Sequence, residues 1–355
     1  MHWELSEEQE LFAASLREWL TAKFPTEVVR KLQSGEDPDR FTDALVKEGW
    51  WGVGYSEEVS GQGGGVLELA LAAREFGRAA VPDSRWLAAA LVAPSLTGQE
   101  LGDQLAGAKR FTLAIRADRI PTFEPLVAQD GSLTGTVRHV VGARGTDVFV
   151  VPVKGPEGLG LARVSAADAV IGPDRLLDRS RDAATVEFTG APILEAVPTD
   201  ESSLSRTTTL AGVLVAADAL GSAERMLDLA VEYSKQRKQF GQFIGSFQAV
   251  KHAAAQMLVT VEASDSTALY AAAALDAGID AAATIAAVAK AQVTGTVADL
   301  AESALTVHGA IGYTWEHDLH LFYKRAKLDR TLFGPPAAWN ERIAAVLLDE
   351  PVRQG

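Results

Sequence analysis

The first part of the chain carries apolar residues at the spacing of amphipathic helices. Ser6 and Gln9 match a capping box, in which each side chain bonds to the backbone of the other residue. Apolar side chains then recur three or four positions apart, at Leu11, Phe12, Leu16, Trp19 and Leu20. Similar spacing predicts helices over residues 40–47, 66–76 and 84–91. We therefore expect the chain to begin with a helical region.

From about Lys109 the pattern changes to short runs rich in β-branched and aromatic residues. These runs cover residues 111–115, 135–141, 147–153 and 184–188, and Gly, Pro and Asp residues separate them. Such spacing predicts a small antiparallel β unit, which ends near Pro198. Helical spacing returns afterwards over residues 204–236, 247–277, 281–308 and 336–348. The predicted fold class is α+β, mainly α, with a β unit between two helical regions.

Composition narrows the range of partners and chemistries. The 355 residues include 33 Lys and Arg against 47 Asp and Glu, and the net charge of −14 argues against nucleic acid or an anionic membrane as the main partner. The chain has no cysteine, which excludes disulfides, thiolate catalysis and cysteine-bound metals. Charged residues interrupt the alanine-rich run 268–293, which therefore predicts a buried helix pair and no membrane span. No secretory signal is evident at the start, and we expect a cytoplasmic protein.

One short segment is basic although the chain is acidic. Residues 233–252 contain four positive charges, two glycines and several aromatic and amide side chains, between two long helical patterns. A basic, glycine-containing corner at the start of a helix can hold an anion through side chains and free backbone N–H groups. Its aromatic rings could stack on a flat ligand. The alternative is an ordinary solvated loop between two helices, and composition alone does not decide between them.

Two motifs on these helices give the chain a resemblance to the acyl-CoA dehydrogenase family. They are Arg237–Gln248 and Val307–His320, and the resemblance covers essentially the whole chain. It implies an N-terminal helical domain over residues 1–107, a middle antiparallel β-domain over residues 108–198 and a C-terminal four-helix bundle over residues 199–355. The reaction implied is α,β-dehydrogenation of an acyl-CoA thioester. In that chemistry a glutamate takes the α-proton and FAD accepts the hydride.

The resemblance also assigns residues that contact FAD across a subunit interface. Arg237 would pair with the pyrophosphate, because a guanidinium fork suits phosphate oxygens. Phe240 would pack on the nucleotide end, and at Gly309 the backbone would approach the adenosine diphosphate part closely. The full set of implied cofactor-binding residues is Arg237, Gln239, Phe240, Gln248, His308 and Gly309.

The same comparison finds no catalytic base. The position that holds the principal glutamate of the family holds Phe333 here, and the alternative position on the preceding long helix holds Ala211. Glu201 and Glu224 lie several residues from that second position and are the remaining candidates. The β region departs as well: residues 111–122 and 137–142 stand where the family carries its flavin-lining stretches.

Metal and hydrolase chemistry have little support in the sequence. Residues 316–320 offer four potential ligands, but these do not share one helical face, and we expect no metal. The Gly-x-Ser-x-Gly motif of serine hydrolases is absent.

The combined prediction is the non-catalytic subunit of a heteromeric acyl-CoA dehydrogenase. It resembles the α2β2 enzymes of actinobacterial steroid side-chain degradation, in which each heterodimer shares one FAD. The implied substrate is a bulky steroid-linked acyl-CoA, and the implied electron acceptor is of the electron-transfer-flavoprotein type. Two alternatives stay open: a self-sufficient homo-oligomeric dehydrogenase with an unrecognised base, and a purely structural homologue without a redox role.

Overall fold

The computed structural model describes residues 5–349, and these form two compact units. The helical unit consists of residues 5–31, 66–81 and 212–349. The sheet unit consists of residues 32–65 and 82–211. The predicted boundaries at residues 107 and 198 stay predictions, but all strands of the large sheet fall between Phe111 and Pro198, within the predicted β region.

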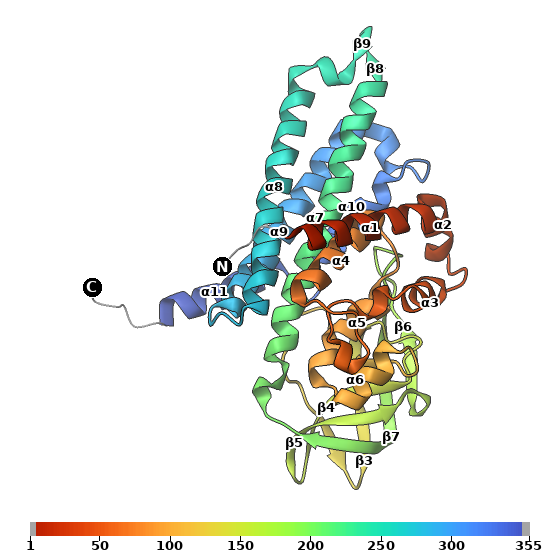
Figure 1. The fold of residues 1–355 in the computed structure, drawn as a ribbon, viewed down its shortest axis with the longest axis vertical. Coiled ribbons are helices and arrows are strands. Elements are labelled where there is room, and N and C mark those ends of the chain that lie inside the picture. The colour runs from red at the N-terminus through yellow and green to blue at the C-terminus, as the bar shows by residue number, and fades with distance from the viewer. Residues whose placement is uncertain (1–4, 350–355) are drawn as a thin grey trace, which may run out of the picture. The chain divides into compact units, whose positions relative to one another are not determined.

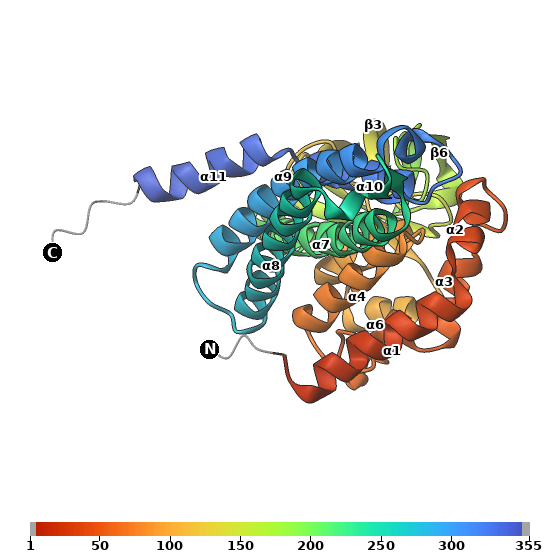
Figure 2. The same cartoon turned by 90° about the horizontal axis from the view of Figure 1, so that it is seen from above.

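The helical unit is built around long helices that run alongside one another. Its helices are α1 (Glu7–Lys23), α2 (Thr26–Gln33, which continues into the sheet unit), α4 (Val66–Ala79), α7 (Ser205–Gln236, which begins in the sheet unit), α8 (Gln248–Asp276), α9 (Ala282–His308), α10 (Leu319–Thr331) and α11 (Pro336–Asp349). Figures 1 and 2 show α7, α8, α9 and α10 side by side. The predicted capping box at Ser6 is confirmed. None of the helices in residues 5–349 is long and apolar enough to cross a membrane.

Small residues and one buried ion pair hold α4, α7 and α10 together. A Cβ atom on Gly77 would overlap the carbonyl of Asp218, and one on Gly221 would overlap the carbonyl of Arg74, so the two backbones touch. The fully buried guanidinium of Arg325 donates to both carboxylate oxygens of Asp218, at 2.8 and 2.6 Å, and to the carbonyl of Val81 at 2.8 Å. These hydrogen bonds and the ion pair with Asp218 compensate the cost of burying the Arg325 charge.

In the sheet unit, a seven-stranded sheet packs with short helices. The helices are α3 (Arg40–Lys47), α5 (Ser84–Val92) and α6 (Gly98–Leu105). The strands are β1 (Phe111–Leu113), β2 (Leu126–Gln129), β3 (Ser132–Val141), β4 (Val148–Gly155), β5 (Gly158–Ser165), β6 (Ala169–Pro173) and β7 (Ala183–Pro198). Short 3-10 turns complete the unit at Trp50–Gly52, Glu57–Val59, Ala93–Ser95, Ala166–Asp168 and Glu201–Leu204.

The sheet closes on itself. Its order is β1-β4-β2-β3-β7-β5, β5 pairs again with β4, and β6 adds to β7. The pairings are mostly antiparallel, as predicted, but β4 runs parallel to both β1 and β2. Inside, Phe149 and Phe188 meet edge to face at 5.8 Å within a core of aliphatic side chains. Closure of the ring β4-β2-β3-β7-β5 gives each of these strands two neighbours, and β1 and β6 remain as edge strands with one partner each.

Candidate functional site

The basic segment between α7 and α8 forms a two-strand hairpin. β8 (Lys238–Gln239) pairs antiparallel with β9 (Gln242–Phe243), and Phe240 and Gly241 make the turn between them. Their φ angles are +51° and +79°, the left-handed values that a type I′ turn requires at both positions. A positive φ is energetically unfavourable for a residue as bulky as Phe240. A bulky residue held in such a conformation is a candidate for a functional role of its side chain.

Side chains that were predicted to contact the cofactor face solvent on this hairpin. Figure 1 shows the hairpin at one end of the helical unit, beyond the ends of α7 and α8. Phe240 is 92% exposed. Three more predicted residues are exposed: Arg237, Gln239 and Gln248. The backbone of Arg237 is fixed, because its N–H donates to the Tyr233 carbonyl at 2.9 Å and its carbonyl accepts from the Ile244 N–H at 2.8 Å. A fixed backbone thus presents an accessible guanidinium to an anion.

Gly309 offers an open stretch of backbone at the end of α9. It begins the 3-10 turn η7 (Gly309–Tyr313), with φ +64° and ψ −142°, a conformation that favours glycine. It is exposed, and no atom lies within 4 Å of the place that a Cβ would occupy. The space around Gly309 would let a ligand approach the main chain closely, and its contact with the cofactor stays a prediction.

His308 lies inside, against α7, which ends one residue before Arg237. It is 3% exposed, its Nδ1 lies 2.7 Å from the Ala304 carbonyl oxygen, and its ring stacks on Tyr233 with centroids 4.8 Å apart. Burial lowers the pKa of His308. Tyr233 precedes Arg237 by one helical turn, so this stack brings the two sequence motifs together. A direct contact between His308 and the cofactor stays a prediction.

Three exposed aromatic side chains lie in the same two motifs and were not among the predicted site residues. Phe243 is 45% exposed, Tyr313 is 74% exposed and Trp315 is 58% exposed. The ammonium group of Lys324 lies 3.9 Å from the centre of the Trp315 ring. The sequence shows aromatic residues close to glycines in both motifs, but spacing alone does not indicate whether such a ring faces the core or solvent.

The histidines of residues 316–320 make contacts within the turn. His317 Nδ1 accepts from the backbone N–H of Leu319 at 3.1 Å, and His320 Nδ1 lies 2.7 Å from the His317 carbonyl oxygen. Across the part of the chain that the structure describes, no group of three or more His, Cys, Asp or Glu side chains could hold a metal ion.

The two positions where the family would place its base are apolar and buried. Phe333 is 1% exposed with φ +55°, and its carbonyl accepts from Trp339 Nε1 at 3.0 Å. Ala211 is fully buried in α7. Neither side chain can accept a proton, so these positions have no function in deprotonating a substrate.

A buried lysine supports the turn that follows Phe333. Lys290, on α9, is fully buried, and its Nζ donates to the carbonyls of Asp329 at 2.9 Å and Gly334 at 3.1 Å. Burial lowers the pKa of Lys290 from 10.5 to about 7, against the opposing effect of the Asp329 carboxylate. The turn around Phe333 and Gly334 is thus held by a titratable amine that donates to backbone carbonyls on both sides of Phe333.

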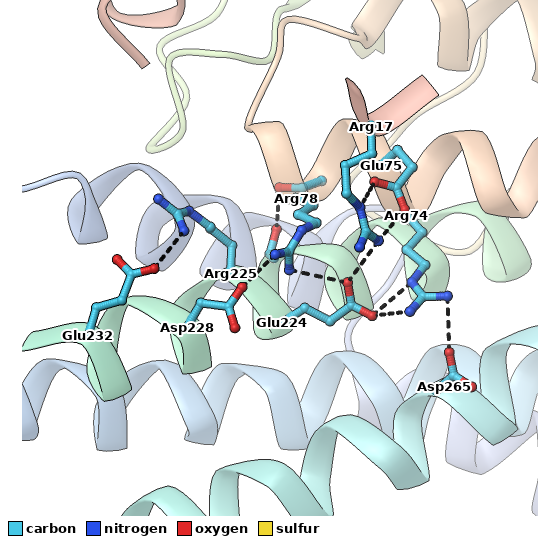
Figure 3. Close-up of polar contacts among 11 residues, drawn as sticks. Arg17, Arg74, Glu75, Arg78, Glu224, Arg225, Asp228, Glu232 and Asp265 are labelled. Atoms are coloured by element: carbon cyan, nitrogen blue, oxygen red, sulfur yellow. Dashed lines mark hydrogen bonds and ion pairs between the residues drawn. The ribbon is translucent and has the colours of Figure 1, made fainter. Parts of the chain in front are cut away.

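Glu224, one of the two remaining candidates for the base, lies in an arginine cluster (Figure 3). Arg74 Nε donates to it at 2.8 Å, and guanidinium groups of Arg78 and Arg17 lie 3.5 and 3.8 Å from its other oxygen. Its side chain is 11% exposed. To reach a substrate proton it would have to leave these partners. Glu201 lies exposed on a surface 3-10 turn.

In the sheet unit, the two segments that depart from the family pattern come together. Residues 114–126 and 136–137 line one depression of about 520 Å³. Ion pairs lie along its lining: Arg116 donates to Asp118 at 3.0 and 2.6 Å, and Arg119 donates to Glu124 at 3.1 Å. Residues of both segments therefore line the same depression, which is not evident from their separation in sequence.

Comparisons with known proteins agree with the motifs. The family model described as acyl-CoA dehydrogenase, N-terminal domain, matches residues 6–98, and the C-terminal domain model matches residues 204–348. Acyl-CoA dehydrogenase FadE34 of Mycobacterium tuberculosis is 34% identical over 85% of this chain, which spans 41% of that protein. Acyl-CoA dehydrogenase IpdE2 of Mycolicibacterium smegmatis is 30% identical over 96% of this chain and 99% of that protein.

Solved structures share the fold. One is the ChsE4-ChsE5 complex from Mycobacterium tuberculosis, with a TM-score of 0.88 at 24% identity, over 99% of this chain and 100% of that chain. Another is the Tcur3481-Tcur3483 steroid ACAD, with a TM-score of 0.86 at 24% identity, over 97% of this chain and 98% of that chain. With both of its motifs, its predicted fold and a relative matched along nearly its whole length, the chain belongs to the acyl-CoA dehydrogenase family.

Proposed function

We propose that this chain is the base-lacking subunit of a heteromeric acyl-CoA dehydrogenase and that it completes the FAD site of a homologous partner subunit. One contrast carries the proposal. The residues that would reach a cofactor from outside, on the hairpin and at Gly309, are accessible. The residues at the two base positions, Phe333 and Ala211, are buried and apolar.

The exposed groups suit FAD, the cofactor that the family uses. The guanidinium of Arg237 would bind the pyrophosphate, because its fork of donors matches phosphate oxygens. The amides of Gln239 and Gln248 would add hydrogen bonds, and the ring of Phe240 would pack on the nucleotide end. Gly309 would let the main chain approach the adenosine diphosphate part. When bound, FAD supplies the hydride-accepting chemistry, and the partner subunit supplies the base.

The names of similar proteins support the proposed partner and substrate classes. The names ChsE4-ChsE5 complex and Tcur3481-Tcur3483 steroid ACAD each join two proteins, which supports a heteromer of homologous subunits, with α2β2 as the simplest arrangement. The second name also supports a bulky steroid-linked acyl-CoA as substrate. An electron-transfer flavoprotein would take the electrons. This chain spans only 41% of the length of FadE34.

Flavin stoichiometry tests the split site. The chain is co-expressed with a homologous dehydrogenase subunit from its own gene neighbourhood, and the ratio of flavin to each polypeptide is measured in the purified complex. We expect one FAD per heterodimer and no stoichiometric FAD on this chain alone. An isolated chain that binds one FAD and oxidises an acyl-CoA would overturn the proposal and favour the self-sufficient enzyme.

Replacing Arg237 tests the residues. In the complex, Arg237→Ala should weaken FAD binding roughly 10- to 150-fold, the equivalent of about 1.5–3 kcal/mol for hydrogen bonds to a charged group. Lys235→Ala is the matched control, because it removes an exposed positive charge from the last turn of α7, two residues before Arg237. Equal flavin content in the two variants would remove Arg237 from the cofactor site and favour a purely structural role for the chain.

A further inference from the structure

The turn that carries Gly309 has little regular structure of its own. From Gly309 to Asp318 the chain passes through η7 and an irregular loop, where Thr314 N–H bonds to the Ile311 carbonyl at 3.0 Å. Tyr313 and Trp315 on this stretch are largely exposed. A loop of this kind needs contacts from other elements to keep one conformation, because each ordered residue costs about 1–2 kcal/mol of conformational entropy.

Arg30, on α2, supplies such contacts at two points of the loop. Its Nη1 donates to the carbonyl of Trp315 at 2.6 Å, and its Nη2 donates to the carboxylate of Asp318, also at 2.6 Å. The two partners lie 285 and 288 positions away in sequence. One planar guanidinium thus fixes both ends of a four-residue segment, a geometry that an ammonium group, with its single compact charge, does not reproduce.

The segment that Arg30 holds is connected to Gly309 through stacked rings. His317 lies between the two residues that Arg30 binds, and its ring meets the ring of His308 at 4.5 Å. His308 in turn stacks on Tyr233 of α7 and directly precedes Gly309. A shift of the segment would therefore move His317 against His308, at the point where the backbone opens for a ligand.

We propose that Arg30 is a positioning residue for the cofactor site: by clamping Trp315 and Asp318 it holds the Gly309 turn in the conformation that receives the partner's FAD. This inference rests on the proposed function for its ligand. Arg30 itself need not touch the cofactor. It acts through the loop, so its loss should affect the mobility of the turn and FAD affinity more than the stability of the fold.

The partial exposure of the Arg30–Asp318 ion pair allows an effect on FAD affinity to be distinguished from an effect on the stability of the fold. The side chains of Arg30 and Asp318 are 28% and 31% exposed, and partly exposed ion pairs contribute on the order of 1 kcal/mol or less to global stability. Arg30→Gln should therefore fold with a nearly unchanged melting temperature. Its loop amides, over residues 313–318, should exchange hydrogen faster than those of the unaltered chain, because the opening of this local segment becomes easier.

Lys327 offers a matched control within the helical unit. Its ammonium group also bonds to one carbonyl, that of Ala298 at 2.8 Å, and to one carboxylate, that of Glu302 at 2.7 Å, with side chains 21% and 54% exposed. Lys327→Gln removes a similar set of contacts between α9 and α10, away from residues 313–318. Any loss that both variants share is a general effect of losing such a contact.

The experiment measures FAD affinity of the complex and hydrogen exchange of the chain in the same variants. We expect Arg30→Gln to weaken FAD binding about 5- to 10-fold, Arg30→Lys to recover part of the loss, and Arg30→Gln with Asp318→Asn to be no worse than Arg30→Gln alone, since both remove one interaction. Lys327→Gln should bind FAD normally. FAD affinity in Arg30→Gln equal to that of Lys327→Gln would overturn the inference, even if the loop exchanges faster.

Failure of this inference is distinguishable from failure of the proposed function. If Arg237→Ala weakens FAD binding and Arg30→Gln does not, the cofactor site stands and the clamp is only structural. If neither variant changes FAD binding, both proposals are wrong.

Discussion

Lys290 gives a prediction that can be worked out from its surroundings. It is fully buried among the helices of the helical unit, with its amine bonded to the carbonyls of Asp329 and Gly334. Its pKa in the folded chain is about 7, against 10.5 for an unperturbed lysine. Between these two values the unfolded chain holds a proton that the folded chain has released. The free energy of unfolding must therefore rise as the pH rises from about 7 towards 10.5.

The size of this rise follows from the two pKa values. One unit of pKa corresponds to about 1.4 kcal/mol, and the linkage relation predicts a gain of about 2.5 kcal/mol between pH 7.5 and pH 9.5 from this group alone. The assay is urea unfolding at several pH values, compared between the unaltered chain and Lys290→Met. The variant keeps the length and apolar stem of the side chain but cannot titrate.

The difference between the two unfolding curves isolates Lys290 from all other titrating groups. It should change by about 2.5 kcal/mol over that range. Lys251→Met, at an exposed position of α8, is the control and should leave the pH dependence unaltered. If Lys290→Met and the unaltered chain showed parallel curves, the amine would be charged throughout, and the carboxylate of Asp329 would be holding its proton in place.

Three further predictions concern packing, the rejected base and acid stability. Gly221→Ala should lower the free energy of unfolding in urea by about 3 kcal/mol or more, because the added methyl would overlap the carbonyl of Arg74. Gly295→Ala, at a helix position with room for a methyl, is the control and should be neutral or stabilising by up to about 1 kcal/mol in the same assay. Glu224→Gln should destabilise the chain by about 2 kcal/mol, because it removes a charged acceptor that Arg74 and Arg78 share, while Asp265 and Asp228 still pair with them. It should leave the turnover of the assembled enzyme unchanged, and a stable but inactive variant would identify Glu224 as the base. Burial holds the pKa of His308 below its ordinary 6.5. Its protonation therefore opposes folding, and the free energy of unfolding should fall as the pH drops below about 6.5. In a series of melting temperatures at different pH values, His308→Phe should show a smaller fall at acidic pH.

Much of the fold could be predicted because its signals are local. The capping box at Ser6 and the long helices α7, α8 and α9 depend on residues a few positions apart, and their predicted bounds agree with the structure to within one residue at each end. Helices α2, α6 and α10 were missed. Length does not explain this, because the predicted α3 and α5 have only 8 and 9 residues. In α10, five charged residues among 13 interrupt the apolar spacing.

Pairings that span long stretches of sequence could not be predicted. The strands β2, β5 and β6 were missed, as were the parallel pairings of β4 and the closure of the sheet, because a strand's neighbours depend on how distant segments pack. The exposure of Trp315 and Tyr313 was hidden for a similar reason. A ring in a glycine-rich run can face either the core or solvent, and only the surrounding helices decide which.

The sequence by itself determined which motifs the chain shares with the family and which residues stand at positions 333 and 211. A phenylalanine at position 333 and an alanine at position 211 cannot take a proton in any fold, and the hairpin and His-Gly motifs identify the family from adjacent residues. Tertiary structure alone decided the roles of groups that are far apart in sequence. It placed Glu224 among arginines and brought Arg30 to Trp315 and Asp318 across more than 280 positions. Hydrogen bonds and ion pairs act over a few ångströms of space, and the spacing of residues along a chain does not specify which distant side chains will come that close.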